Sequence, residues 1–216
     1  MTSTIQSLLK FEILFWDFDG VIKDSVYAKT EAFVELFKDS SPEVKNKIKI
    51  HHESNGGMSR YEKIPLYMEW SGLKDMNEKT VGDFADQYAK LVFNKVVHSK
   101  WVDGVVEYIT EYNKNQKMYL ITATPQAEME KILQHLNISH LFIQAFGYPN
   151  TKSKVIQDIL NKTAVSKEKA CMIGDSSADL LAAKDNQISF ILRLTEYNIN
   201  LKNDYASIYF ERLVHG

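Results

Sequence analysis

The sequence predicts an α/β protein in which a parallel sheet is flanked by helices and a second, all-helical region is inserted near the start of the chain. Two observations lead to this prediction. Short apolar runs, typical of buried strands, alternate with helical patterns over the later part of the chain, and such alternation favours right-handed crossovers and a parallel sheet. Residues 25–99 contain no convincing strand pattern. We therefore expect a core of residues 1–24 and 100–216 and a helical domain of residues 25–99.

Five short apolar runs are predicted to form the strands of the core, at 12–16, 118–121, 141–146, 170–173 and 188–192. Helices are expected between the later runs, because apolar residues there recur at offsets of three and four, which places them on one face of a helix. These stripes lie within 105–112, 129–136 and 155–160. The alternation of strands and helices is what predicts the parallel order of the sheet.

The inserted region shows helical patterns only. Apolar stripes predict helices within 26–37 and 81–92. Between them, Ser59 and Glu62 have the spacing of a capping box at a helix start. Pro65 would either kink the helix that follows or mark its true first turn.

The inserted region would join the core through hinges at 23–25 and 98–104. It leaves the chain directly beside Asp17 and Asp19, which favours a lid over a site at the strand ends. The alternative is a helical subdomain that only enlarges the core.

The composition is that of an ordinary globular protein. The 216 residues carry a net charge of -2 and 44% are hydrophobic, which disfavours a dedicated nucleic-acid binder or a polybasic membrane-surface protein. No apolar stretch approaches the length of a membrane-spanning helix, and the first residues lack the pattern of a signal peptide. The one cysteine, Cys171, excludes an intrachain disulfide and is expected in the core. These features predict a cytoplasmic protein.

Two aspartates at the end of the first predicted strand are the most informative feature of the sequence. Asp17 and Asp19 follow the apolar residues 13–16. Residues two apart along a strand point the same way, and two close carboxylates cannot both ionise without a counter-ion. The pair therefore indicates a divalent cation, a shared proton or two separate chemical roles.

Polar residues also follow the other predicted strands. Thr122 and Ala123 follow the second, a lysine-bearing loop at 147–154 follows the third, and Asp175 and Asp179 follow the fourth. In open parallel sheets ligands bind beyond the carboxyl ends of the strands, so these groups are expected to converge. Carboxylates suit Mg2+, and a lysine with a hydroxyl suits a phosphate group. An aspartate can then act as nucleophile through an aspartyl-phosphate.

These features, taken in order, resemble the four motifs of the haloacid dehalogenase superfamily: Asp17-Phe18-Asp19-Gly20-Val21, a strand ending in Thr122, a lysine, and Gly174-Asp175 with Asp179. The resemblance extends over the whole chain. It implies a Rossmann-like core with a parallel sheet and an all-helical cap domain between the first and second motifs. It also implies a phosphoric monoester hydrolase that uses Mg2+ as its cofactor.

The resemblance implies a role for each matching position. Asp17 would be the nucleophile and a Mg2+ ligand. Asp19 would protonate the leaving alcohol and then activate water, and its main-chain carbonyl would reach the metal. Thr122 and the amide of Ala123 would hold phosphoryl oxygens. Because a halide leaves without a proton, the dehalogenases of the family lack the second acid, so Asp19 favours phosphate chemistry.

The remaining roles concern the metal and the lysine. Asp175 would ligate Mg2+, and Asp179 would support the metal directly or through water. The spacing Gly-x-Pro-x-x-Lys favours Lys152 as the phosphate-binding lysine, with Lys154 as the alternative.

The predicted cap carries two candidate substrate-binding residues, Arg60 and Lys63, at an i, i+3 spacing. They would reach a second anionic group of the substrate. The string Gly-x-Ser-Arg resembles the cap of β-phosphoglucomutases and related sugar-phosphate phosphatases. Alternatively, Arg60 pairs with Glu62 or a neighbouring acid. His51 and His52 are expected to be exposed at a helix end, and two adjacent helical positions do not form a zinc site.

The leading hypothesis is a phosphatase acting on a small phosphorylated metabolite, such as a sugar phosphate or a phosphoglycolate-like carboxylate, because a helical cap encloses small substrates. A β-phosphoglucomutase-like mutase is the alternative. Those mutases carry a histidine early in the first cap helix, where this chain has Lys29. A non-catalytic binding module is a third interpretation, and it would have lost Asp17, Asp19 or Asp175. The expected partner is the metabolite alone, without nucleic acid or membrane, for a monomer or weak dimer.

Overall fold

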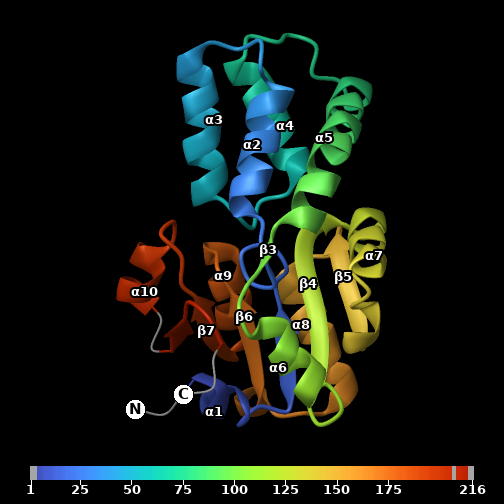
Figure 1. Ribbon diagram of the computed structural model, residues 1–216, viewed down its shortest axis with the longest axis vertical. Coiled ribbons are helices and arrows are strands. Elements are labelled where there is room, and N and C mark those ends of the chain that lie inside the picture. Colours follow the sequence, from blue (N-terminus) through green and yellow to red (C-terminus); the bar gives the residue numbers. More distant parts are fainter. Residues whose placement is uncertain (1–3, 206–207, 214–216) are drawn as a thin grey trace.

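The computed structural model describes residues 4–205 and 208–213 (Figure 1). Its strands are β1 (Ile13–Trp16), β2 (Lys23–Asp24), β3 (Lys100–Trp101), β4 (Lys117–Pro125), β5 (Gln144–Tyr148), β6 (Ala170–Gly174), β7 (Ser189–Arg193) and β8 (Tyr209–Phe210). Its α-helices are α1 (Thr4–Leu8), α2 (Val26–Leu36), α3 (Pro42–Ser54), α4 (Arg60–Trp70), α5 (Glu78–His98), α6 (Val105–Tyr112), α7 (Gln126–His135), α8 (Lys152–Thr163), α9 (Ser177–Asn186) and α10 (Ile199–Tyr205). Short 3₁₀ turns lie at Ser139–Leu141 and Lys167–Lys169.

The core is a six-stranded sheet in the order β5-β4-β1-β6-β7-β8, and every neighbouring pair is parallel. Strand β1 lies inside the sheet between β4 and β6, with Ile13 opposite both Lys117 and Ala170. The prediction of a parallel α/β sheet is confirmed. A strand in this position ends at the centre of the carboxyl edge, where ligands bind in such folds.

The two faces of the sheet are covered by different helices. Because side chains alternate along a strand, neighbouring residues of β1 enter different parts of the core. Leu14 and Trp16 pack with α6 and α7, whereas Ile13 and Phe15 pack with α8 and α9. The strand is buried from both sides, which explains why it is apolar at every position.

Helices α2 to α5 stand together beyond the carboxyl ends of the strands, at the top of Figure 1. Aromatic side chains fill the space between them. Phe33 of α2 stacks on Tyr88 of α5, with ring centroids 3.9 Å apart, and meets Tyr67 of α4 edge-on at 5.2 Å. Their apolar residues form one cluster with one face of the sheet. The helices therefore cover the edge at which the site residues emerge.

The two connections to this helical segment, predicted as hinges, lie side by side. Strands β2 and β3 form a separate antiparallel pair in which Lys23 is opposite Trp101. The Lys23 ammonium donates a hydrogen bond to the Val97 carbonyl at 3.1 Å and lies over the Trp101 ring. The chain thus enters and leaves the helical segment through one short paired ribbon.

Two strand boundaries differ from the sequence prediction. The run at 141–146 was expected to be a strand, but β5 begins only at Gln144 because the chain first makes the 3₁₀ turn that ends at Leu141. Strand β4 continues past 121 because Pro125 still pairs with Tyr148 of β5 after a register shift. Residues 122 and 123 therefore lie within β4 instead of after it.

In the helical segment, the pattern of apolar residues did not predict the position of Pro65 within α4 or the presence of helix α3. Helix α4 begins at Arg60, so Pro65 lies inside it and does not mark its start. Glu62 accepts a hydrogen bond from the Ser59 amide at 3.0 Å, as expected at a helix start. Helix α3 was not predicted, because it buries only Ile48 and His52 and its apolar stripe is sparse.

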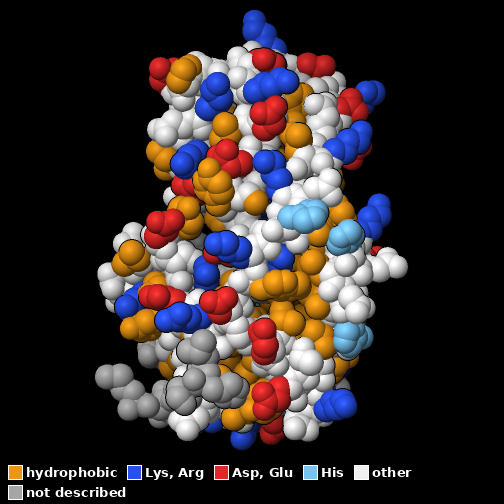
Figure 2. Space-filling model, in the orientation of Figure 1, with side chains coloured by type: hydrophobic (Ala, Val, Ile, Leu, Met, Phe, Trp, Pro, Cys, Tyr) orange, Lys and Arg blue, Asp and Glu red, His pale blue; other side chains and the backbone are white. Residues whose placement is uncertain are grey.

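Lysine and arginine side chains are intermingled with aspartate and glutamate on the face shown in Figure 2. This mixture agrees with the net charge of -2. None of the helices in the described ranges is both long and apolar enough to cross a membrane.

Candidate active site

Asp17 stands at the centre of the candidate site. It follows β1 directly, and its amide still donates to the Ile173 carbonyl of β6 at 2.9 Å, so the sheet fixes its backbone. Its Oδ1 accepts a hydrogen bond from the Phe18 amide at 2.8 Å. The residue is only 6% exposed. A carboxylate held this rigidly at the mouth of a cavity is suited to act as a nucleophile.

Lys152, the first residue of α8, joins Asp17 to Asp179. Its Nζ lies 2.9 Å from Asp17 Oδ2 and 2.5 Å from Asp179 Oδ1. Burial favours a lower pKa for this lysine, but the two carboxylates outweigh burial and raise the pKa above its usual value. Lys154, the alternative, is largely exposed and pairs with Asp158 one turn along the helix. The structure therefore brings Lys152, and not Lys154, to Asp17.

Three carboxylates gather around this lysine. One oxygen from each of Asp17, Asp175 and Asp179 lies within 4.8 Å of the others. Burial raises the pKa of Asp17 to about 7, against the opposing effect of Lys152 and with added repulsion from Asp179 and Asp19. Burial, followed by repulsion from Asp17 and Asp179, also raises the pKa of Asp175.

These residues fit a divalent cation. Three acids against one ammonium leave an excess of two negative charges, and carboxylate oxygens are the ligands that Mg2+ prefers. Asp179 Oδ2 already accepts hydrogen bonds from the amide and hydroxyl of Ser176, at 3.1 and 2.6 Å, while its Oδ1 holds Lys152. These bonds suit Asp179 to supporting the metal and orienting the lysine. Within the described residues no hydrogen bond or ion pair occupies the Asp175 carboxylate, so it is the clearest direct ligand. Asp17, which already holds Lys152 and the Phe18 amide, is the second.

Gly20 allows Asp175 to approach the first strand. Its φ of +76° belongs to the left-handed region, and a Cβ there would lie 2.0 Å from Asp175 Oδ2. The glycine of the first motif is therefore needed for the carboxylate of the last motif to reach the site.

Asp19 faces away from the three clustered acids. Its carboxylate accepts hydrogen bonds from Ser25 at 2.6 Å, Lys29 at 2.5 Å and Thr124 at 3.3 Å. Burial favours a higher pKa, but the charge of Lys29 and these hydrogen bonds outweigh it and lower the pKa of Asp19. The side chain of Asp19 does not belong to the acidic cluster; the expectation of a metal contact concerned its main-chain carbonyl.

Thr122 and Ala123 line the same cavity as Asp17. Thr122 is 2% exposed, and its Oγ1 accepts a hydrogen bond from the Thr124 amide at 3.2 Å. The register shift in β4 separates this stretch from β5. The hydroxyl of Thr122 and the main chain at Ala123 are thus presented at the carboxyl edge beside the nucleophile.

Arg60 enters the cavity from α4 but is already paired. Both of its terminal nitrogens contact the Glu128 carboxylate of α7, at 2.8 and 2.7 Å, and its guanidinium lies over the Tyr88 ring. The alternative of pairing with an acid is therefore what the structure shows, although the acid is Glu128 and not Glu62. A planar, bidentate pair of this kind links the helical segment to the core.

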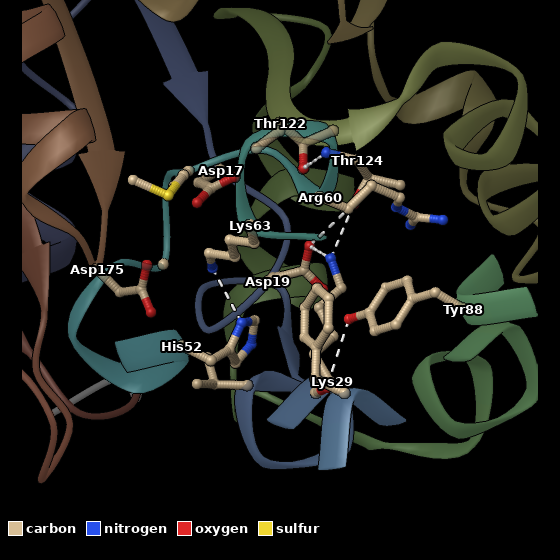
Figure 3. Close-up of a pocket in the computed structure, with 15 residues that line it drawn as sticks. Asp17, Asp19, Lys29, His52, Arg60, Lys63, Tyr88, Thr122, Thr124 and Asp175 are labelled. Atoms are coloured by element: carbon tan, nitrogen blue, oxygen red, sulfur yellow. Dashed lines mark hydrogen bonds and ion pairs between the residues drawn. The ribbon is translucent and has the colours of Figure 1, made fainter. Parts of the chain in front are cut away.

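Lys63 lies one turn further along α4, and its environment differs. It is 1% exposed, and its Nζ lies 2.9 Å from Nδ1 of His52 (Figure 3). Burial, reinforced by repulsion from Lys29, lowers the pKa of Lys63 to about 7. His52 is 5% exposed, so the expectation of an exposed histidine at this position is wrong; the close packing of α3 on α2 buries it against Phe33.

Several residues that line this cavity or contact its side chains were not predicted from the sequence to belong to the site. Lys29 was considered only as a replacement for the mutase histidine, and Ser25, Thr124, Glu128, Tyr88 and His52 were not assigned to the site. Thr124 carried a local signal, because it lies two residues from Thr122 on an extended strand. Glu128 carried none, because its partner Arg60 is 68 residues away.

The cavity between the core and the helices is small, with a volume of ≈ 40 Å³. Both sides contribute to its wall: the core supplies the acids and the stretch 122–124, and the helices supply lysine, arginine, histidine and apolar side chains. Figure 3 shows these groups directed toward one space. Such an enclosed site suits a small substrate held away from bulk water.

The sequence model of the haloacid dehalogenase-like hydrolases matches residues 13–192, and the chain belongs to this family. The protein is therefore a hydrolase of that family, with the Rossmann-like core that the sequence predicted. Among curated proteins, no sequence matches this chain.

Solved structures show the same fold over nearly the full chain. A predicted phosphoglycolate phosphatase from Haemophilus somnus is 17% identical, with a TM-score of 0.73, and the match covers 94% of this chain and 95% of that one. A β-phosphoglucomutase from Clostridium difficile is 19% identical, with a TM-score of 0.71 and coverage of 92% and 90%. CbbY from Rhodobacter sphaeroides, in complex with xylulose-(1,5)bisphosphate, is 15% identical, with a TM-score of 0.73 and coverage of 94% of each chain.

Proposed function

We propose that the protein is a Mg2+-dependent phosphatase that hydrolyses a small phosphorylated metabolite through an aspartyl-phosphate on Asp17. One observation carries the proposal. The buried Asp17, held by Lys152, faces an enclosed cavity together with a second acid, Asp19, which has its own hydrogen-bond partners. A phosphatase needs this division, because one carboxylate attacks phosphorus while another moves a proton.

The chain's own residues supply most of the mechanism. Asp17 Oδ attacks the phosphorus atom while Lys152, the Thr122 hydroxyl and the Ala123 amide hold the phosphoryl oxygens. Although burial opposes it, the charge of Lys29 lowers the pKa of Asp19, so Asp19 must take up a proton with the substrate before it gives that proton to the leaving alcohol. It then takes a proton from the water that hydrolyses the acyl phosphate. Asp17, Asp175 and the carbonyl of Asp19 would hold Mg2+, which neutralises phosphoryl charge when it is bound.

Two residues orient Asp19 for this role. Ser25 and Lys29, at the start of the helical segment, bond its two oxygens separately. Ser25 directly follows β2, and Lys29 lies in α2. A movement of the helical segment would therefore change the position of Asp19, the proton-transferring acid. We propose on this ground that residues 25–99 act as a cap domain that closes over substrate, and that residues 1–24 and 100–216 form the catalytic core.

The mutase alternative receives less support. Lys29 occupies the place of the mutase histidine and pairs with Asp19, and Arg60, which would receive a second phosphate, is neutralised by Glu128. We also propose that the protein is cytoplasmic, which its single, buried cysteine, Cys171, supports. It would act as a monomer or weak dimer and would bind neither nucleic acid nor a membrane.

The test is phosphate release from a panel of small phosphate monoesters, with Mg2+ and with a chelator. We expect metal-dependent release that falls at least about a thousandfold in Asp17→Asn, because the amide cannot attack phosphorus. The exposed Asp158→Asn variant serves as the matched control and keeps the wild-type rate. Interconversion of sugar phosphates without phosphate release would favour the mutase, and turnover by Asp17→Asn would contradict the mechanism.

A further inference from the structure

Three cationic side chains of the helical segment line the cavity, and two of them are neutralised by acids of the core. Lys29 pairs with Asp19, and Arg60 pairs with Glu128 through both of its terminal nitrogens. Within the described part of the chain, no carboxylate forms an ion pair with the third cation, Lys63. Its side chain is nevertheless almost completely buried, at 1% exposure.

Among the described residues, the polar partner of Lys63 is neutral. Its Nζ lies 2.9 Å from Nδ1 of His52, and burial lowers the pKa of that histidine far enough to keep the ring uncharged. Attraction by Asp19, Glu62 and Asp175 is weaker than the effects of burial and of repulsion by Lys29. A buried ammonium without a counter-charge is strongly unfavourable. Its position on the cavity wall indicates that a ligand supplies the missing negative charge.

The phosphoryl group is not that ligand, because its own binding groups lie on the core. Lys152, Thr122 and Ala123 surround Asp17 at the end of the sheet, and the excess acids there call for a cation. Lys63 and His52 belong to α4 and α3 of the helical segment and line the same cavity from there. A substrate whose phosphorus faces Asp17 therefore presents its organic part to Lys63.

We propose that Lys63, held by His52, binds a carboxylate at the organic end of the substrate, so that the substrate is a short phosphorylated acid and not a neutral sugar phosphate. The proposal rests on the proposed phosphatase function for the orientation of the substrate. A carboxylate fits better than a second phosphate, because Arg60, the side chain with the geometry for a bidentate phosphate contact, is occupied by Glu128.

The test uses two phosphonates that differ only at the organic end, phosphonopropanoate and its amide, phosphonopropanamide. Neither carries a phosphate ester bond, so their dissociation constants report binding without turnover. Calorimetry on the full-length protein with Mg2+ is expected to show at least about tenfold tighter binding of the carboxylate, the size of one charge-assisted hydrogen bond. In Lys63→Met the preference is expected to fall below about twofold.

Lys79→Met, at an exposed lysine of the helical segment, is the matched control, and it is expected to leave both dissociation constants unchanged. Equal binding of the two probes by the wild type would overturn the proposal without relying on any variant. A preference that survives in Lys63→Met would overturn it too, and failure of both probes to bind would contradict the short phosphorylated acid. Phosphate release in the panel assay tests the phosphatase function separately, so loss of the carboxylate preference leaves that function standing.

Discussion

The core wall and the helical wall of the active site deal with charge in opposite ways. On the core wall Asp17, Lys152 and Asp179 form one connected set, because the Lys152 ammonium pairs with one oxygen of each carboxylate. On the helical wall Arg60 is paired with the core, whereas Lys63 has only a neutral histidine. The protein itself therefore positions the charged groups around Asp17, whereas the cation Lys63 on the helical wall has no charged partner among the described residues.

The strongest test of the core wall is to remove its lysine. Lys152→Met leaves two buried carboxylates without their partner, so we expect at least about a hundredfold loss of phosphate release. The free energy of unfolding is expected to fall by about 3–5 kcal/mol. Lys154→Met, two residues along the same helix, removes only an exposed i, i+4 pair and is expected to change stability by less than about 0.5 kcal/mol. Equal effects of the two variants in denaturant titrations would contradict the assignment.

The next test concerns the excess negative charge of the three clustered carboxylates on the core wall. Asp175→Asn removes one of the clustered carboxylates, and we expect Mg2+ affinity measured by calorimetry to fall at least about tenfold. Asp185→Asn, on the exposed side of α9, is the control and is expected to bind Mg2+ as the wild type does. Unchanged affinity in Asp175→Asn would remove that residue from the proposed metal site.

The ion pair between the two walls can be measured with a double-mutant cycle. Arg60→Met and Glu128→Gln each leave a buried polar group without its partner, so each is expected to destabilise the protein by about 2–3 kcal/mol. The double variant is expected to lose clearly less than the sum of the two. The exposed pair of Lys79 and Asp83 gives the reference, with a coupling below about 0.5 kcal/mol. Additive losses at Arg60 and Glu128 would show that the pair does not act as a unit.

The smallest expected effect is the change in stability when Lys63, the cation without a charged partner among the described residues, is replaced. The pKa of Lys63 is about 7 in the folded protein and 10.5 when unperturbed. Below pH 7 both states hold the proton and the full penalty of burial is present. Between pH 7 and 10.5 only the unfolded state holds it, so wild-type stability rises with pH relative to a variant without the amine. Lys63→Met is expected to be more stable than the wild type by on the order of 1–3 kcal/mol at pH 7, with a difference that shrinks toward pH 10.

That prediction is checked by denaturant unfolding of both proteins at several pH values. A stability difference that stays constant between pH 7 and 10 would show that Lys63 keeps its proton in the folded protein. A less stable variant at pH 7 would show that the ammonium is already compensated by a group of the chain.

The reactive wall was predictable because its signal is local. Asp17 and Asp19 follow an apolar strand, and Asp175 and Asp179 follow another. Strand ends and residue alternation are properties of short stretches, and the order of the motifs is read along the chain, so the sequence placed these acids at one edge of a parallel sheet. The choice of Lys152 over Lys154 was favoured by spacing, and the structure adds the reason: only Lys152, at the first position of α8, reaches Asp17.

Only the tertiary structure decided how the helical wall is charged. Arg60 and Glu128 meet because α4 and α7 pack across the site, and His52 is buried because α3 packs on α2. Neither fact leaves a trace in spacing or composition, since the partners are far apart in the chain. The sequence by itself determined the fold class, the family and the candidate reacting acids, because periodicity is local and the order of motifs is read directly along the chain. Burial and pairing depend on which distant surfaces come together, so the unpaired state of Lys63 emerged only from the folded protein.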